Sequence, residues 1–288
     1  MPRIRRRYVI APVAFIIIIG SHYLLSFYGN RARAKEECRL QLGSIALALV
    51  TYESVHHSFP SGTVPNDRLT PEHRLSWYFD IIYYIQAWSA PLSVNSDEAW
   101  DSAANRSLVW NGIDKVDGTK RMHSANLMNI FMCPMEREGR TTDHPSITNY
   151  IGIAGLGADA PILPPGHPRA GIFGYDRRTK VADVTDGLST TMMVAESARD
   201  NGWWTAGGPA TVRGVDPADR PQIGKGRPFG GLHEGGAMVC FADGSVRFVR
   251  STIAPEVFEA LTTIAGGEKI TGDDLAKATE SVSQNRGR

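Results

Sequence analysis

The chain has 288 residues, 42% of them hydrophobic, and its 31 basic and 30 acidic side chains leave a formal charge of +1. No basic tract follows the N-terminal arginines, which excludes binding of nucleic acid through a strongly charged surface. The roughly 255 residues beyond the N-terminal segment are enough to bury a sizeable core.

The first predicted element is a membrane-spanning helix at residues 8–28, which read YVIAPVAFIIIIGSHYLLSFY and carry no charge. About twenty apolar residues cross about 30 Å of hydrocarbon as a helix. Four arginines lie in the basic tail at residues 1–7, so the positive-inside rule places this tail in the cytoplasm and exports the rest of the chain. A cleaved signal peptide is the alternative, because Ala32-Arg33-Ala34 resembles a cleavage site. The long apolar core favours an uncleaved signal anchor.

The helix is predicted to continue beyond the membrane over residues 29–58. Apolar residues recur there in alternating steps of four and three, which is the spacing of one helix face. We expect this face to pack on a sheet formed by later residues, and the Phe59-Pro60 pair to end the helix. The predicted stripe consists of Cys38, Leu42, Ile45, Leu49 and Tyr52.

Residues 59–270 are predicted to form an exported globular head of short elements separated by Gly and Pro, followed by a polar tail at 271–288. Periodicity and turn residues set the element types. The predicted helices lie at 75–87 and 254–265, with a short one in 97–105; the strands lie at 128–134, 148–152 and 192–196; an irregular loop covers 155–174.

A β-hairpin is predicted near the C-terminus. Residues 237–242 and 245–249 are short apolar runs, and Asp243-Gly244 between them supplies the positive φ angles of a tight two-residue turn. His233 lies ten residues before Asp243, so the two side chains meet only if the chain folds back. No Ser or Cys has the surroundings of an activated nucleophile. We therefore assign His233, Asp243 and Gly244 structural roles and predict no catalytic residue.

The cysteines lack the CxxC spacing of a zinc site, which needs four ligands, so no metal site is predicted. Cys38 lies on the apolar helix face and Cys133 ends a strand-like run, so these two are the candidate disulfide pair if the head is exported. Cys240 alternates with apolar residues in a strand and is expected to be buried. The Trp203-Trp204 pair is either a binding platform or packing at the edge of the core.

The order of motifs resembles a known family. The motifs are CRLQLGSIALALVTYESVHHSFP, RLSWYFDIIYYIQ, DEAWDSAAN, FMCP, TNYIG, VTDGLSTTMMVAES and FGGLHEGGAMVCFADGSVRFV. Together they are similar, over residues 31–267, to the bacterial domain of unknown function 1559, or H-x9-DG, proteins. Members commonly resemble pilins and pseudopilins, in which a long N-terminal helix, membrane-embedded in its first half, packs on an antiparallel sheet.

The resemblance has one departure and one further implication. Residues 7–13 lack the Gly-Phe junction of a prepilin leader and the span lacks a Glu, so processing by a prepilin peptidase and polymerisation into a pilus are not implied. Because pseudopilins are known for a calcium-holding loop, Asp183, Asp186 and Asp243 are an alternative calcium set. The spacing of Asp183 and Asp186 is explained more simply by a capped turn.

These observations predict an α+β, pilin-like protein with a single membrane span and its head on the outer side of the bacterial inner membrane. We expect a non-enzymatic envelope protein that acts in assembly, secretion or surface organisation with pilin-like or secretion-system partners, and without a cofactor. The alternative is a membrane-anchored ligand-binding protein whose pocket is formed by residues 202–208 and the 155–174 loop.

Overall fold

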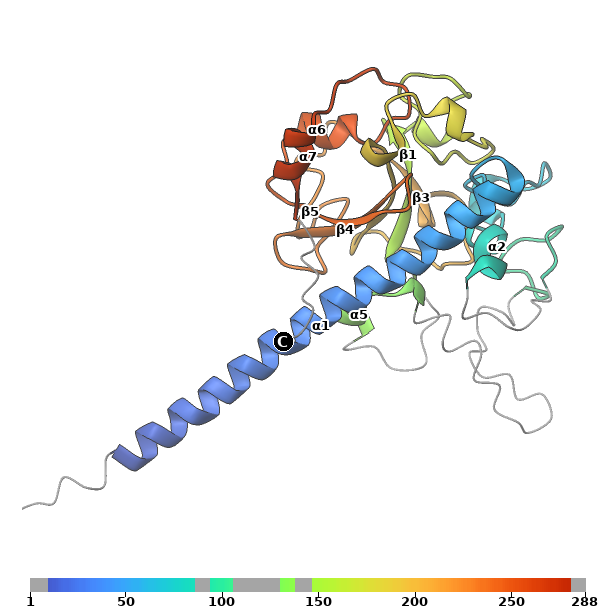
Figure 1. Ribbon diagram of the computed structural model, residues 1–288. Coiled ribbons are helices and arrows are strands. Elements are labelled where there is room, and N and C mark those ends of the chain that lie inside the picture. Colours follow the sequence, from blue (N-terminus) through green and yellow to red (C-terminus); the bar gives the residue numbers. More distant parts are fainter. Residues whose placement is uncertain (1–9, 86–93, 106–129, 138–146, 281–288) are drawn as a thin grey trace, which may run out of the picture.

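The computed structural model describes residues 10–85, 94–105, 130–137 and 147–280, with side chains from residue 29 onward. One long helix lies diagonally against a head built around a single sheet (Figure 1). The predicted basic tail at 1–7 lies outside these ranges, and so do the side chains of the predicted span at 8–28. Among the described residues, no helix is both long enough and apolar enough to cross a membrane.

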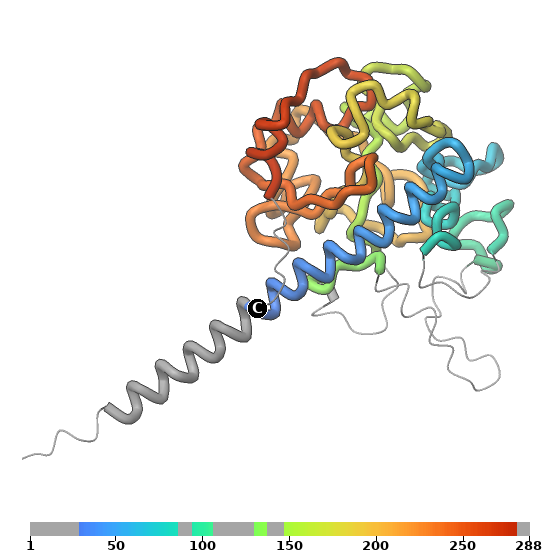
Figure 2. The backbone as a smooth tube through the Cα atoms, viewed as in Figure 1, coloured from blue at the N-terminus to red at the C-terminus, as the bar shows by residue number. Residues whose placement is uncertain are grey.

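Helix α1 runs without interruption from Ile10 to His56, two residues short of the predicted end. Its C-terminal half lies along the head (Figures 1 and 2), whereas its N-terminal part extends away from the head (Figure 1). The helix ends where His57 adopts a φ of 58°, a left-handed conformation that cannot continue a right-handed helix. All five residues of the predicted stripe are buried, with exposed fractions between 0% and 4%, which confirms the predicted packing face.

Within the described ranges, six strands form one mixed sheet in the order β3-β1-β2-β4-β5-β6. The prediction of an α+β fold is confirmed, but the prediction of a fully antiparallel sheet is wrong. After β2 the chain crosses to the other side of β1. There β3 forms an edge strand of the sheet and pairs parallel with β1. The strands are β1 (Tyr150–Leu156), β2 (Met192–Glu196), β3 (Val212–Val215), β4 (Gly236–Phe241), β5 (Val246–Arg250) and β6 (Thr279–Glu280).

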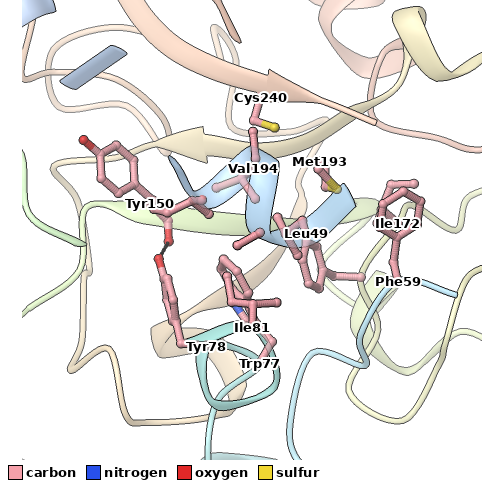
Figure 3. Close-up of a cluster of buried hydrophobic side chains, with 14 of the residues drawn as sticks. Leu49, Phe59, Trp77, Tyr78, Ile81, Tyr150, Ile172, Met193, Val194 and Cys240 are labelled. Carbon is pink, nitrogen blue, oxygen red and sulfur yellow. Dashed lines mark hydrogen bonds between the residues drawn. The ribbon is translucent and has the colours of Figure 1, made fainter. Parts of the chain in front are cut away.

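Both faces of the sheet are covered, so the central strands are buried along their whole length. One face carries Tyr150, Val194 and Cys240 against α1 and α2 (Tyr78–Ile81), as Figure 3 shows. The hydroxyl of Tyr78 donates a hydrogen bond to the carbonyl of Tyr150 at 2.6 Å. The other face packs beneath α6 (Pro255–Ala260) through a second apolar cluster. This double burial explains why Met192 to Ala195 of β2 form an unbroken apolar run.

Several predicted elements differ in type. Residues 75–87 are predicted to be one helix, but Leu75 pairs with Ala206 in a bridge. Of the described residues up to Ile85, only α2 and a 3-10 turn are helical. Residues 97–105 form turns rather than a helix. The run at 128–134 is not a strand where described: Ile130 and Phe131 are helical, and α5 (Pro134–Arg137) begins at its proline. Proline fixes φ at a helical value and suits the first helical turn.

The C-terminal part contains more structure than predicted. Within the predicted tail, α7 (Gly272–Ala278) begins with a capping box formed by Thr271 and Asp274, and β6 then pairs with β5. The predicted helix at 254–265 is shorter than expected and ends as α6 at Ala260. Residues 281–288 lie outside the described ranges.

The predicted hairpin is present as β4 and β5, but its turn differs from the prediction. The loop has three residues, Ala242 to Gly244, closed by a hydrogen bond from the Phe241 amide to the Ser245 carbonyl at 2.9 Å. Gly244 has a φ of 80°, whereas Asp243 is not among the residues with positive φ. This is a type I turn followed by a left-handed glycine bulge. Asp243 Oδ1 accepts hydrogen bonds from the amide and hydroxyl of Ser245, which holds the turn.

Asp80 on α2 provides a pH-dependent prediction. Burial raises its pKa to about 6, opposed by the charge of Arg178, and its Oδ2 accepts no hydrogen bond. Because the folded state holds this proton more tightly than the unfolded state, stability falls as pH rises from about 4 to about 6. Asp80→Asn should remove that slope and raise the free energy of unfolding at pH 7 by up to about 3 kcal/mol.

Denaturant unfolding in detergent at pH 4 and pH 7 measures this difference. Asp67→Asn replaces an exposed aspartate and should leave the pH profile of the parent unchanged. Equal stability of Asp80→Asn and the parent at both pH values would show that the Asp80 carboxylate is solvated.

Candidate functional site

Four side chains from four separate parts of the chain converge at the interface between α1 and the sheet. Cys38 lies on α1, Cys133 precedes α5, and Glu196 is the last residue of β2. His233 lies in the loop before β4, where it forms an isolated bridge with Gly236. We call Cys38, Cys133, Glu196 and His233 the four-residue cluster.

The functional atoms of this cluster are close together and shielded from water. His233 Nε2 lies 3.2 Å from Glu196 Oε1 and 3.4 Å from Cys133 Sγ. One sulfur, nitrogen or oxygen atom from each of the four residues lies within 4.8 Å of all the others. Both cysteines and Glu196 are 0% exposed, and His233 is 8% exposed. Cys38 and Cys133 are joined in a disulfide, the pair singled out from the sequence.

The two carboxylate oxygens of Glu196 have different partners. Oε2 accepts a hydrogen bond from the amide of Met238 at 3.2 Å. Oε1 lies 3.2 Å from His233 Nε2, but this buried atom accepts no hydrogen bond. A buried carboxylate oxygen without a donor is costly. Oε1 is therefore the part of the cluster most in need of a positive partner.

Glycines place His233 in this position. The backbone amide of Gly230 donates to the carbonyl of Glu196 at 2.7 Å, which joins the loop to the end of β2. Gly230 and Gly231 have φ angles of 80° and 94°, a region that side chains other than glycine rarely adopt. These two residues reverse the chain so that His233 faces β2 before β4 begins.

His233 and Asp243 do not meet. They lie at opposite ends of β4, His233 in the cluster and Asp243 in the hairpin turn. Asp243 is also paired with Arg247 at 3.4 Å. His233 and Asp243 therefore do not form a catalytic pair. We interpret both as residues with structural roles.

The predicted calcium set is also dispersed. Asp186 accepts from the amides of Gly266 and Gly267 at 2.7 and 3.1 Å, and Asp183 accepts from the amide of Lys180 at 2.8 Å. Among the described residues, the only group of three or more acidic, His or Cys side chains close enough to share a metal ion is the four-residue cluster. Asp183, Asp186 and Asp243 do not form such a group.

A cavity of about 690 Å³ opens beside the cluster, and His233 forms part of its wall. Its other charged lining residues are Arg31, Lys35, Lys225 and Glu234. Neither segment of the predicted ligand pocket lines this cavity. Trp204 is 5% exposed and packs against core aromatic rings, while Trp203 packs against Trp100.

Sequence reasoning found three members of the cluster as separate features and missed Glu196 entirely. The available signal was the position of Glu196, directly after the four apolar residues of β2. A glutamate that continues a buried strand is itself expected to be buried, and a glutamate is almost never fully buried unless it is paired. The absence of a metal site was predicted from cysteine spacing alone. That reasoning did not consider that Glu196 and His233 could complete a set of four potential ligands.

Comparison with families of known proteins gave one match, over residues 31–215, to the family described as "Protein of unknown function (DUF1559)". The matched segment includes α1 from Arg31 onward and the sheet as far as β3, and ends before the hairpin. No curated protein and no solved structure matched the chain. Because the matched residues make up more than half of its length, the chain belongs to the DUF1559 family.

Proposed function

We propose that this protein is a non-enzymatic, membrane-anchored envelope protein whose exported head is carried on α1. The observation that supports this proposal is the continuity of α1 from Ile10 to His56, with packing on the head beginning near Ala34. The part before Ala34 is about 36 Å long at 1.5 Å per residue, which exceeds the roughly 30 Å of hydrocarbon in a bilayer. Residues 10–28 of the predicted apolar span lie in this projecting part.

A rigid connection between anchor and head is the expected property of a protein that positions its head at the membrane surface. The apolar stripe of α1 is buried in the head, and the Cys38–Cys133 disulfide joins the helix to a second segment. The anchored head would therefore have a fixed orientation relative to the membrane. This geometry suits assembly, secretion or surface organisation.

The outward face of α1 favours association with a second copy of the chain. Leu40 and Leu47, seven residues apart, are 55% and 51% exposed, and Val55 is 57% exposed. A seven-residue spacing places side chains on one helix face. Copies anchored in one membrane present this face at the same height, so a second α1 is the partner that we propose for it.

Anchoring is tested by alkaline extraction of cell membranes. The full chain should remain in the membrane pellet, and protease added to spheroplasts should remove a tag placed after Arg288. Replacing Ile17 and Ile18 with Arg should release the chain from the pellet, because each charge near the middle of a span costs about 2.5 to 3.5 kcal/mol. Release of the unaltered chain by alkali would contradict the proposal.

Association through α1 is tested by thiol crosslinking in native membranes. Leu47→Cys should give a crosslinked dimer with a short bifunctional maleimide. Ile162→Cys is the matched control, because Ile162 is an exposed apolar residue of the head, 73% exposed, away from α1. Equal crosslinking at both positions would indicate random collision and would rule out a specific α1 interface.

A second candidate function, binding of an anionic ligand, is favoured by the cavity beside His233. Arg31, Lys35 and Lys225 line it, but Arg31 is paired with Glu234 at 3.4 Å and Lys35 with Glu280 at 2.9 Å. Lys225 is therefore the lining cation that we propose for the anion. Such a concave site, with several converging charged groups, suits a phosphorylated small molecule. This location differs from the pocket expected from the sequence.

Thermal unfolding with added phosphorylated metabolites tests this alternative. A bound ligand should raise the melting temperature of the parent by about 2–4 °C for each kcal/mol of binding. Lys225→Ala should abolish the shift, whereas Lys269→Ala, which replaces an exposed lysine outside the cavity, should preserve it. Identical shifts in both variants would place the ligand elsewhere.

A further inference from the structure

We propose that the four-residue cluster binds one Zn²⁺ ion when Cys38 and Cys133 are reduced. The cluster then has two thiolates, one imidazole and one carboxylate, all of which are ligands that zinc accepts in four-coordinate sites. Under this proposal, the disulfide and the zinc-bound dithiol are two alternative states of the same cysteine pair. The inference does not depend on membrane anchoring or on the ligand-binding alternative.

The distances fit a tetrahedral ion. Zinc bonds of about 2.0 to 2.3 Å place neighbouring ligand atoms about 3.3 to 3.8 Å apart. The contacts of His233 Nε2 with Glu196 Oε1 at 3.2 Å and with Cys133 Sγ at 3.4 Å are close to this range. All four ligand atoms lie within 4.8 Å of one another, so only small side-chain rotations are needed once the sulfur atoms separate.

Glu196 provides an independent observation that points to a cation. Its side chain is 0% exposed, its Oε2 is held by the Met238 amide, and its Oε1 faces His233 without accepting a hydrogen bond. A hydrogen bond to one oxygen of a ligating carboxylate is the usual way in which a protein orients the other oxygen toward a metal. A bound Zn²⁺ would supply the positive partner that Oε1 lacks.

Charge and access are also compatible with an ion at this position. Two thiolates and one carboxylate around Zn²⁺ leave a net charge of −1. Lys225 in the lining of the adjacent cavity would partly offset this charge, whereas Arg31 and Lys35 are paired with Glu234 and Glu280. His233 forms part of the wall of that cavity, which places the imidazole ring between the cluster and the cavity. Calcium is disfavoured because it prefers oxygen ligands.

Interconversion of the two states requires an external dithiol. The dithiol breaks the Cys38–Cys133 bond through a mixed disulfide, gives two electrons and two protons to the cysteines, and leaves as its own disulfide. Zinc binding then displaces the two thiol protons. The cluster would therefore link metal occupancy to the thiol redox conditions around the head.

Cobalt substitution tests the site directly. The full-length protein in detergent is reduced with a phosphine, stripped with a chelator and titrated with Co²⁺, followed by Zn²⁺ as competitor. We expect one Co²⁺ per chain, with the thiolate charge-transfer and tetrahedral ligand-field bands, and displacement by Zn²⁺. The oxidised protein, in which mass spectrometry should find Cys240 as the single free thiol, should show no such bands.

Substitutions assign the ligands. Cys38→Ser, Cys133→Ser, His233→Ala and Glu196→Gln should each weaken binding at least about tenfold, the lower end of the loss seen on removing an outer partner of a metal ligand. Cys240→Ser and Glu234→Gln are the controls, since they remove a thiol and a carboxylate outside the cluster, and should bind as the parent does. Circular dichroism identifies any variant that fails to fold.

Two outcomes would overturn the proposal. The first is reduced, folded parent protein that gives no thiolate-to-cobalt band at a saturating cobalt concentration. The second is a band that survives both His233→Ala and Glu196→Gln at the parent affinity, which would assign the metal to the cysteines alone. Both measurements are made on protein that circular dichroism shows to be folded, so misfolding does not explain either outcome.

Discussion

The structure depends on the burial of one face of α1 against the sheet. Cys38, Leu42, Ile45 and Leu49 are fully shielded from water, and each apolar side chain buried in this way contributes about 1.5 to 3 kcal/mol. The same contact covers one face of the sheet, whose central strands have no solvent-facing side. Without α1, the residues of that face, such as Tyr150 and Val194, would be exposed to water.

This contact also creates the four-residue cluster. Cys38 belongs to the apolar stripe, so the packing of α1 on the sheet brings it close to Glu196, at the C-terminal end of β2. His233 reaches the same place through the loop that leads into β4. The histidine of the H-x9-DG motif therefore has its closest chemical partners in Glu196 and Cys133 rather than in Asp243. His233 and Asp243 therefore make separate contacts at the two ends of β4.

Elements with strong local patterns were predictable. The stripe on α1 has helical spacing, and β2 and the β4–β5 hairpin combine apolar runs with turn residues, so neighbouring residues alone specify them. The run at 128–134 was misread because a short apolar segment has no period that separates strand from helix. The parallel pairing of β3 with β1 was not predictable, because it depends on where the crossing chain arrives after leaving β2.

The sequence by itself determined an N-terminal helix with one packing face, an α+β head closed by a hairpin, and membership of a family through the order of its motifs. Only the tertiary structure decided which chemical groups meet. Cys38 and Cys133 are 95 residues apart, and Glu196 and His233 reach them through a strand end and a glycine-rich loop. Contacts of this kind leave no local period in the sequence, because their geometry is set by the packing of whole elements.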